Sequence, residues 1–427
     1  MLPKGWQRAT LGAIASVKSG GTPARSQHDR YFLNGKWPWV KTMDLTNSAI
    51  LATDELITDL ALAESSCKLY PPGTLLVAMY GGFKQIGRTG LLREESAVNQ
   101  AISAIALDLN RAHPEFVLHW LNGNVGAWKS FAASSRKDPN ITRENVCDFP
   151  VTLPTLFEQH RIAQILSTWD QSIATTERLL ANGRMQWNAL IGLTLHLPSA
   201  NPDASAPTDN GGFPASVQPG IPTLPPAPKG WRRIQLRDHL KEVRRPVALV
   251  DDETYTLVTV KRSRGGVALR EVLRGEEVKT PTQFYVHADD FLISKRQIVH
   301  GACGIVPPEL DGAVVSNEYA VLNTDGEIDL RFLRYLSESR YFQQTCFHSS
   351  IGVHVEKMIF KTDHWLNWPF NIPPLAQQKH IVKILDTASR EVVSIAEQMK
   401  ALKREKSALM SQLLTGKRRV QLQEPSA

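Results

Sequence analysis

Short glycine-containing segments that carry basic, hydroxyl and aromatic side chains are the residues of this sequence best suited to contact a polyanion. Arginine and lysine neutralise phosphate or donate to guanine O6 and N7, and glycine lets backbone amides approach phosphate. In the first half of the chain the candidate contact residues are Lys18, Thr22, Lys41, Thr42, Tyr80, Lys84, Arg88, Arg136 and Lys137. In the second half they are Lys261, Arg262, Ser263, Arg264, Lys295 and Arg296. Any one of these segments is also typical of a solvated turn, so their recurrence in both halves is what favours contact with DNA.

Motifs for catalysis, in contrast, are missing from the sequence. It contains no Gly-x-Gly-x-x-Gly or Gly-x-x-x-x-Gly-Lys phosphate loop and no His-Glu-x-x-His zinc motif. Cys67, Cys147, Cys303 and Cys346 lie far apart, a spacing that fits neither a zinc site nor a disulfide framework. The sequence therefore predicts a binding protein that is not an enzyme and uses no metal and no cofactor.

The composition is that of an ordinary globular protein with a mild excess of positive charge. Hydrophobic residues make up 42% of the 427 residues and charged residues 21%, and the formal net charge is +7. This charge is compatible with a polyanionic partner without identifying one. The N-terminus lacks the apolar run of a signal peptide, and no apolar stretch reaches the ~20 residues that span a bilayer. We therefore expect a cytoplasmic protein.

The elements that must position these contacts come in two copies. The motif Pro3-Lys4-Gly5-Trp6 recurs at Pro228-Lys229-Gly230-Trp231, and residues 150–162 resemble residues 369–381. Between these ends, Val40-Lys41 resembles Val260-Lys261, and Asn99-Gln100 resembles Asn317-Glu318. Because the matches fall in the same order along both halves, the sequence indicates an internal duplication.

Each copy ends in a long predicted helix with a heptad pattern. Apolar side chains alternate by four and three residues over about four heptads, which is typical of a coiled-coil seam. The seam residues are Ile162, Leu166, Trp169, Ile173, Leu180 and Trp187 in the first helix and Ile381, Leu385, Val392, Met399, Leu402 and Leu409 in the second. We expect the helices to pack on each other; the alternative is two independent helices, each lying on its own domain. Thr155 and Glu158 form a predicted capping box, and Pro198 and Gly416 mark the predicted helix ends.

The globular parts combine short apolar strands with short amphipathic helices, without βαβ alternation or the even spacing of an all-β fold. The predicted class is α+β, with two mixed α/β domains in tandem, each followed by its helix. The predicted boundaries are a first domain at 1–153, a helix at 154–197, a linker at 198–228, a second domain at 229–372, a helix at 373–416 and a tail at 417–427. The linker is rich in proline and has no lysine or arginine, which predicts a solvated, partly extended segment.

A set of short motifs follows a fixed order along the first half of the chain. They are Lys4-Gly5-Trp6, Ser19-Gly20-Gly21-Thr22-Pro23, Trp37-Pro38-Trp39, Pro71-Pro72-Gly73-Thr74, Asn99-Gln100 and Pro154 with Glu158-Gln159. In this order the motifs resemble the specificity (S) subunit of type I restriction–modification systems. The second half departs from the pattern, since it lacks the Gly-Gly-Thr-Pro and Trp-Pro-Trp elements and has Gln377 in place of Glu158.

This resemblance implies two target-recognition domains, each reading one half of a bipartite site in double-stranded DNA. The two helices would form an antiparallel coiled coil that spaces the domains and docks methyltransferase (M) subunits. Methyl transfer would belong to the M subunits, and translocation and cleavage to restriction (R) subunits. Two alternatives stay open: the DNA-recognition subunit of a fused methylase–nuclease restriction system, and a coiled-coil scaffold that binds no DNA.

Overall fold

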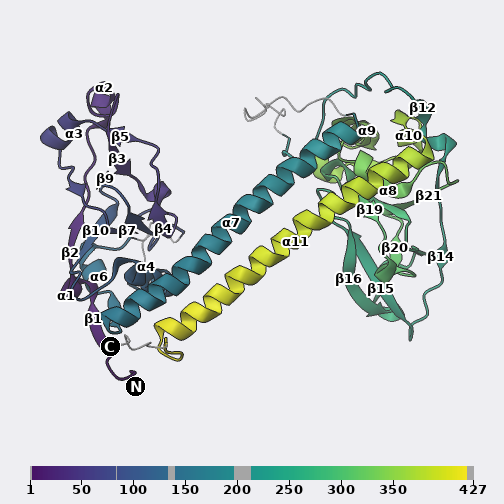
Figure 1. Ribbon diagram of the computed structural model, residues 1–427. Helices are drawn as coiled ribbons and strands as arrows, with labels where there is room; N and C mark the ends of the chain where they lie inside the picture. The colour runs from purple at the N-terminus through teal and green to yellow at the C-terminus, as the bar shows by residue number, and fades with distance from the viewer. Residues whose placement is uncertain (1, 83, 133–139, 197–212, 421–427) are drawn as a thin grey trace. The chain divides into compact units, whose positions relative to one another are not determined.

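The chain folds into two compact units, and each unit contains one globular domain and part of both long helices (Figure 1). The computed structural model describes residues 2–82, 84–132, 140–196 and 213–420. The first unit comprises Met1–Arg178 and Ala396–Ala427, and the second comprises Leu179–Ile395. Each unit therefore combines the beginning of one long helix with the end of the other.

The described part of the first domain contains two main sheets and short α-helices. The five-stranded sheet has the order β2 (Ala15–Ser19), β10 (Ile102–Leu107), β7 (Leu75–Ala78), β8 (Thr89–Leu92) and β4 (Ser48–Ile50). The four-stranded sheet has the order β5 (Leu56–Ile57), β3 (Trp37–Val40), β9 (Ser96–Val98) and β6 (Leu69–Tyr70). The helices are α1 (Leu11–Ile14), α2 (His28–Tyr31), α3 (Asp59–Glu64), α4 (Pro114–Gly123), α5 (Val125–Phe131) and α6 (Arg143–Cys147). Phe116 of α4 and Trp128 of α5 are fully buried with Leu75 of β7, so the main core lies between these helices and the larger sheet.

The second domain likewise contains one four-stranded and one five-stranded sheet. Its four-stranded sheet has the order β13 (Leu240–Glu242), β21 (Tyr319–Thr324), β18 (Phe291–Ser294) and β19 (Cys303–Ile305). Its five-stranded sheet has the order β14 (Pro246–Val247), β17 (Gln283–Tyr285), β20 (Val314–Ser316), β15 (Thr254–Val260) and β16 (Val267–Arg274). The hairpin β22 (Ser350–Ile351) and β23 (Ile359–Phe360) and the helices α8 (Leu330–Leu336), α9 (Arg340–His348) and α10 (Thr362–Trp365) complete it.

The strand registers confirm the internal duplication. Strand β1 (Gln7–Thr10) pairs with β11 (Pro150–Leu153) so that Gln7 faces Leu153. Strand β12 (Arg232–Gln235) pairs with β24 (Pro369–Ile372) so that Arg232 faces Ile372. In both domains the strand that follows β1 or β12 along the chain joins a main sheet: β2 pairs with β10, and β13 pairs with β21.

The register also corrects one predicted match between the copies. Strands β10 and β21, aligned on their partners β7 and β18, make Asn99 equivalent to Ser316 rather than to Asn317. The local hydrogen bonds agree, because the Asn99 side chain accepts from the Ala101 amide at 3.1 Å and the Ser316 hydroxyl accepts from the Glu318 amide at 3.4 Å. Ala101 and Glu318 therefore occupy equivalent positions.

The long helices α7 (Leu156–Thr194) and α11 (Leu375–Leu414) begin and end close to the predicted residues. The capping box is confirmed: Thr155 Oγ1 accepts from the Glu158 amide at 3.3 Å, and Glu158 Oε2 accepts from the Thr155 amide at 3.4 Å. Gly416 has a φ of 71°, the left-handed conformation expected just after a helix end. Pro198 lies outside the described residues. Within the described part of the chain, every helix falls short of the length and apolarity that a bilayer span requires.

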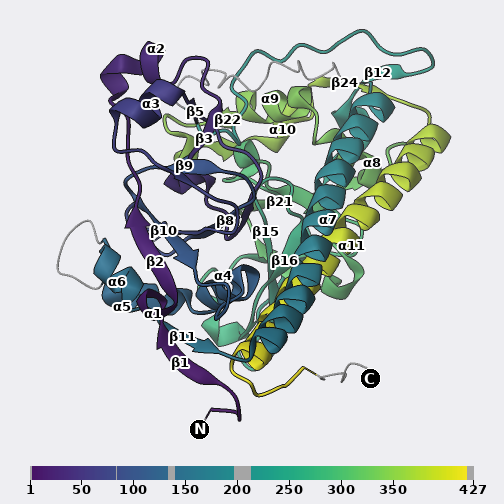
Figure 2. The same cartoon turned by 60° about the vertical axis from the view of Figure 1, so that its left-hand side comes forward.

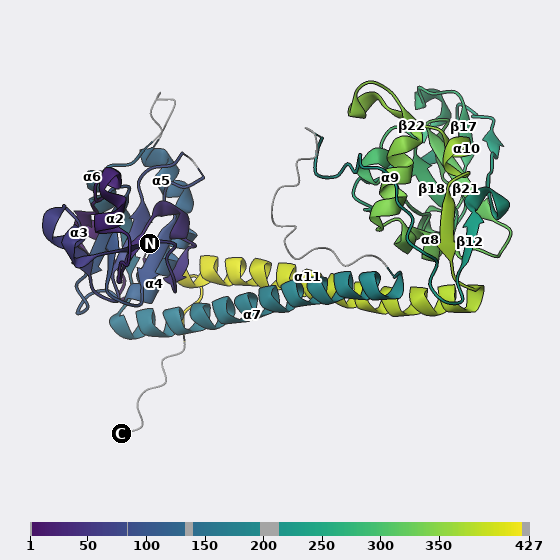
Figure 3. The ribbon, with the colours of Figure 1, turned by 90° about the horizontal axis from the view of Figure 1, so that it is seen from above.

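Helices α7 and α11 pair antiparallel within each unit (Figures 2 and 3). In the first unit Glu177 of α7 binds Lys403 of α11 at 2.7 Å. In the second unit Gly183 of α7 faces Val392, whose side chain would lie 3.4 Å from a Cβ at that glycine. Within the first unit Asp170 also pairs with Lys406, so rising residue numbers on α7 meet falling numbers on α11. Every predicted seam residue is buried or half-buried.

The end of each long helix packs on the domain that belongs to the other copy. At the end of α11, Leu413 and Leu414 are buried in the core of the first domain, together with Trp6. After α7, Leu195 is buried in the core of the second domain together with Trp231, and the His196 ring contacts the Trp231 ring edge-on at 5.3 Å. The repeated Lys-Gly-Trp motif thus supplies the tryptophan on which each helix end rests.

Residues 213–228 of the predicted linker are extended, as expected, and pack partly against the second domain. Val217 is fully buried in this segment. The Pro225 carbonyl accepts hydrogen bonds from Arg233 at 3.0 Å and from Asn371 at 2.9 Å. An extended proline-rich chain keeps its carbonyls available as acceptors, so it can pack along a domain surface without forming a strand. Residues 198–212 of the predicted linker lie outside the described residues.

Candidate nucleic-acid interface

Two motifs of the first domain meet where its sheets join. The indole Nε1 of Trp39 donates to the Gly21 carbonyl at 3.1 Å, and the Gly21 amide donates to the Val98 carbonyl at 2.9 Å. A Cβ at Gly20 would collide with the carbonyls of Val98 and Asn99, so a larger residue does not fit there. The Gly-Gly-Thr-Pro and Trp-Pro-Trp motifs therefore build one corner of the domain and hold the start of the Lys41 turn in place.

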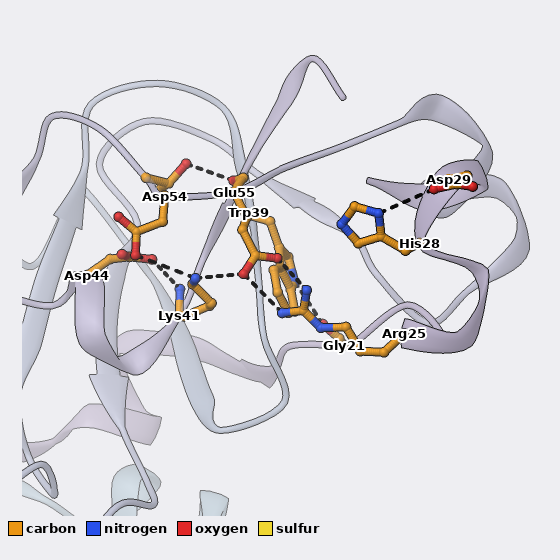
Figure 4. Close-up of polar contacts among 10 residues, drawn as sticks. Gly21, Arg25, His28, Asp29, Trp39, Lys41, Asp44, Asp54 and Glu55 are labelled. Atoms are coloured by element: carbon orange, nitrogen blue, oxygen red, sulfur yellow. Dashed lines mark hydrogen bonds and ion pairs between the residues drawn. The ribbon is translucent and has the colours of Figure 1, made fainter. Parts of the chain in front are cut away.

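At this corner Lys41 belongs to an ion-pair network centred on Glu55 (Figure 4). Its Nζ lies 2.8 Å from Glu55 Oε1 and 3.6 Å from Asp54 Oδ2. The Arg25 guanidinium binds the same Glu55 carboxylate at 2.5 and 3.2 Å and lies 4.9 Å from the centre of the Trp39 ring. Two cations from separate segments therefore share one carboxylate.

The network fixes the charge states of these groups. Hydrogen bonding from Arg25, supported by Lys41, lowers the pKa of Glu55 to about 2 although partial burial opposes the shift. The hydrogen bond to Glu55 raises the pKa of Lys41. The charged Lys41 ammonium is thus already paired with a carboxylate, and a DNA phosphate would have to compete with Glu55 for it. Lys41 remains a predicted contact whose first role in the structure is to brace the turn.

The second predicted segment of the first domain, the loop from Tyr80 to Arg88, lies beside this turn. Tyr80 is 45% exposed, Lys84 is exposed and Arg88 is half-buried. The Gln85 carboxamide donates to the Met43 sulfur at 3.4 Å, which joins the loop to the short helix Thr42–Asp44. The structure therefore brings the predicted residues around Thr42 and Tyr80 together on one surface.

Other predicted residues of the first domain are not part of this surface. Lys18 is exposed on β2, where it faces Ala104 of β10, and no hydrogen bond or ion pair to another described residue is recorded for its side chain. Thr22 is half-buried at the corner formed by the two glycines. Arg136 and Lys137 lie outside the described residues.

In the second domain the predicted basic segment forms the turn between β15 and β16. Its two central residues, Ser263 and Arg264, have φ values of 54° and 56°, a conformation that hairpin turns normally assign to asparagine or glycine. Their amides donate at 2.8 Å to the carbonyls of His300 and Gly301, which pins the turn against the loop after β18. These two hydrogen bonds offset the backbone strain of placing two non-glycine residues in the left-handed conformation.

The side chains of this turn have different roles. Arg264 is 20% exposed and its Nε lies 2.6 Å from Glu338, a carboxyl whose pKa is raised by burial although Arg264 opposes this. Arg264 therefore stabilises the domain interior, which argues against the predicted direct contact. Lys261 and Ser263 are exposed, whereas the Arg262 Nη2 binds Glu356 at 2.8 Å.

Lys295 and Arg296 follow β18 next to this turn. The Lys295 side chain is 17% exposed and binds Glu242 at 3.0 Å. Arg296 is 50% exposed, and its Nε donates to Glu318 Oε1 at 2.5 Å. Of this pair, only Arg296 presents its head group to solvent.

The sequence pointed to basic residues and missed the carboxylates that hold them. Glu55, Glu356 and Glu242 each bind a predicted lysine or arginine, from 14 to 94 positions away along the chain. The spacing of residues along the sequence does not predict these ion pairs, because only the fold brings the partners together. Glu356, which binds Arg262, belongs to the loop between β22 and β23, in which Val353 is 95% exposed.

The two domains match the same protein family. The family model for the type I restriction modification DNA specificity domain matches the chain twice, at residues 3–182 and at residues 228–404. The chain belongs to this family. Each match covers one globular domain of the specificity family and the first part of the helix that follows it.

Individual relatives are distant in sequence. The specificity subunit of the EcoR124I/EcoR124II type I restriction enzyme from Escherichia coli is 23% identical over 38% of this chain, and the match spans 40% of that relative. The crystal structure of an S subunit of a type I restriction–modification system from M. genitalium covers 97% of this chain and 99% of its own, with a TM-score of 0.59 and 13% identity. A second solved structure comes from a description of complex assembly and conformational transition of the type I R-M system. Its match covers 97% of this chain and 99% of that chain, with a TM-score of 0.52 and 18% identity. The structural likeness establishes a shared fold over nearly the whole chain.

Proposed function

We propose that this chain is the DNA-recognition subunit of a type I restriction–modification complex. Each domain would read one half of a bipartite site in double-stranded DNA. The observation that carries the proposal is that each specificity domain holds a loop after an equivalent strand, β7 or β18, and that this loop begins with a different, partly exposed side chain, Tyr80 or Arg296. Equivalent loops with different side chains are what two readers of different half-sites require.

The paired helices would set the distance between the half-sites. Their seam residues are buried or half-buried, so docking of M subunits would use the exposed outer faces of α7 and α11. Methyl transfer and cleavage would belong to M and R subunits, and the recognition subunit would contribute neither a catalytic residue nor a cofactor. The proposed setting is the cytoplasm, where such a complex meets cellular DNA.

The direct test is DNA binding by the chain assembled with its M subunits. We expect a specific duplex to compete against unrelated duplex, with an affinity that falls steeply as salt rises because phosphate contacts release counterions. A scaffold that does not bind DNA would show neither sequence competition nor a salt slope. Co-purification of a single bifunctional methylase–nuclease, instead of separate M and R chains, would assign the chain to a fused restriction system.

A further inference from the structure

Tyr80 and Arg296 occupy the same position in the two domains. In the first domain the Met79 amide donates to the Ala101 carbonyl at 2.8 Å, and the Met79 carbonyl accepts from the Ile141 amide at 3.0 Å. In the second domain Lys295 takes the place of Met79: its amide donates to the Glu318 carbonyl at 2.8 Å. Because Met79 and Lys295 are equivalent, the residues that follow them are equivalent too.

The far end of each loop is also held in the same way. Gly87 and Gly301 both adopt the left-handed conformation, with φ values of 77° and 76°. Each lies two residues before the strand, β8 or β19, that pairs with the strand preceding its loop. Tyr80 and Arg296 therefore stand at the start of a loop that the two domains anchor alike, and both side chains are about half exposed.

In the second domain this position carries a buttressed arginine. The Arg296 Nε donates to Glu318, and Glu318 is itself fixed because its amide donates to Ser316 and its carbonyl accepts from Lys295. Among the described residues, no partner is recorded for the two terminal nitrogens of Arg296. Such a guanidinium is pre-oriented on its Nε edge and offers both Nη groups to an outside acceptor.

The other predicted arginines of the second domain do not offer this pair of donors. Arg262 uses Nη2 to bind Glu356, and Arg264 points into the buried ion pair with Glu338. The two parallel donors of Arg296 match the O6 and N7 acceptors that guanine alone presents side by side in the major groove. A phosphate could also accept them, but it would give no preference among bases.

We propose that Arg296, buttressed by Glu318, reads a guanine in the second half-site, and that Tyr80 occupies the equivalent reading position for the first half-site. This inference rests on the proposed DNA-recognition function. In the first domain Ala101 replaces the buttressing glutamate, and no carboxylate partner among the described residues is recorded for the Tyr80 hydroxyl. The two half-sites should therefore differ in the base read at this position.

The test is selection of binding sites from a randomised duplex library by the complete complex with its M subunits. Arg296→Ala should lose a guanine preference of about 10- to 100-fold at one base pair of one half-site. Arg296→Lys should weaken this preference less, because an ammonium can still donate to guanine but lacks the planar pair of donors that Glu318 orients. Glu318→Ala should weaken the same preference, and Glu318→Gln should weaken it less because the carboxamide oxygen can still accept from Nε. Selection in the other half-site should stay unchanged.

Arg232→Lys is the matched control. Arg232 is an exposed arginine of the same domain that also binds one glutamate, Glu327, at 3.4 Å. Its substitution should leave both half-sites as they are. A second variant, Tyr80→Arg with Ala101→Glu, transplants the buttressed arginine and should create a guanine preference in the first half-site.

The outcomes separate the inference from the function on which it rests. An unchanged motif in Arg296→Ala, or a uniform loss of affinity for every sequence, would overturn the guanine assignment while leaving sequence-specific recognition intact. If the unmodified complex selects no sequence at all, the DNA-recognition function fails and this inference with it. A thermal melt of each variant identifies loss of binding that arises from loss of folding.

Discussion

Lys406 of α11 forms an ion pair with Asp170 of α7, four residues after the seam residue Leu402, where the heptad spacing calls for an apolar side chain. The Lys406 side chain is 18% exposed and the Asp170 side chain 44% exposed. His119 of α4, which is buried, lies 3.8 Å from the same carboxylate. The pair thus joins the two helices beside α4, and a polar pair within an apolar seam is a known means of fixing helix register.

The Asp170–Lys406 pair predicts unequal effects of removing its two members. Asp170→Ala should destabilise the protein by about 1–2 kcal/mol, because it leaves a largely buried ammonium without its partner. Lys406→Met should be neutral or stabilising, because an apolar chain of similar length completes the seam. Chemical denaturation followed by circular dichroism measures both. A greater loss for Lys406→Met than for Asp170→Ala would contradict this account of the pair.

The Glu55 network predicts a stability term that depends on pH. The pKa of Glu55 is about 2 in the folded chain against an ordinary value of 4.5. Because the folded-state pKa is depressed, the stabilisation is present above about pH 4.5 and is lost as the pH falls toward 2. We expect Glu55→Gln to lower the free energy of unfolding by about 2 kcal/mol at pH 6.

The difference between wild type and Glu55→Gln should shrink as the pH is lowered from 5 to 3. Unfolding titrations at a series of pH values measure it, with Glu94→Gln, an exposed glutamate for which no ion pair to a described residue is recorded, as the control. A difference that stays constant over this range would show that Glu55 does not carry the stabilising charge.

Gly20 predicts a steric limit at the corner of the first domain. Gly20→Ala should destabilise the protein by about 1–3 kcal/mol, because its Cβ would press on backbone carbonyls that cannot move separately from the sheet. Gly192→Ala is the matched control: this glycine lies inside α7 with no atom within 4 Å of an added Cβ, and alanine there should stabilise by up to about 1 kcal/mol. Equal melting temperatures for the two variants would contradict the predicted corner.

Lys84 and Lys41 lie at the proposed interface, and their substitution should have different effects on DNA binding and on stability. Lys84 is exposed, and no ion pair to another described residue is recorded for it, so Lys84→Ala should weaken binding to all sequences and reduce the salt slope by about 1 without changing the melting temperature. Lys41→Ala should lower the melting temperature as well, because it removes a cation from Glu55. Titrations at several salt concentrations, together with thermal melts, separate these effects.

Local patterns predicted the helices and failed where contacts are distant in sequence. The heptads and the Thr155–Glu158 capping box located α7 within two or three residues, because helix signals repeat over short spans. The match of Asn99 to Asn317 was one residue out, since identity at a single position is weaker evidence than strand register. The packing of residues 213–228 and the role of Glu318 depend on the folded second domain, and no short window of sequence contains them.

The most direct test of the central claim is a genome-wide map of methylated adenine in cells that carry the chain together with the proposed M and R subunits, compared with cells that lack only this chain. We predict that one split motif, with two unlike halves separated by a fixed spacer, is methylated in the first and unmethylated in the second. Re-expression of the chain should restore it. Identical methylation with and without the chain would contradict the claim that this protein selects the DNA sequence.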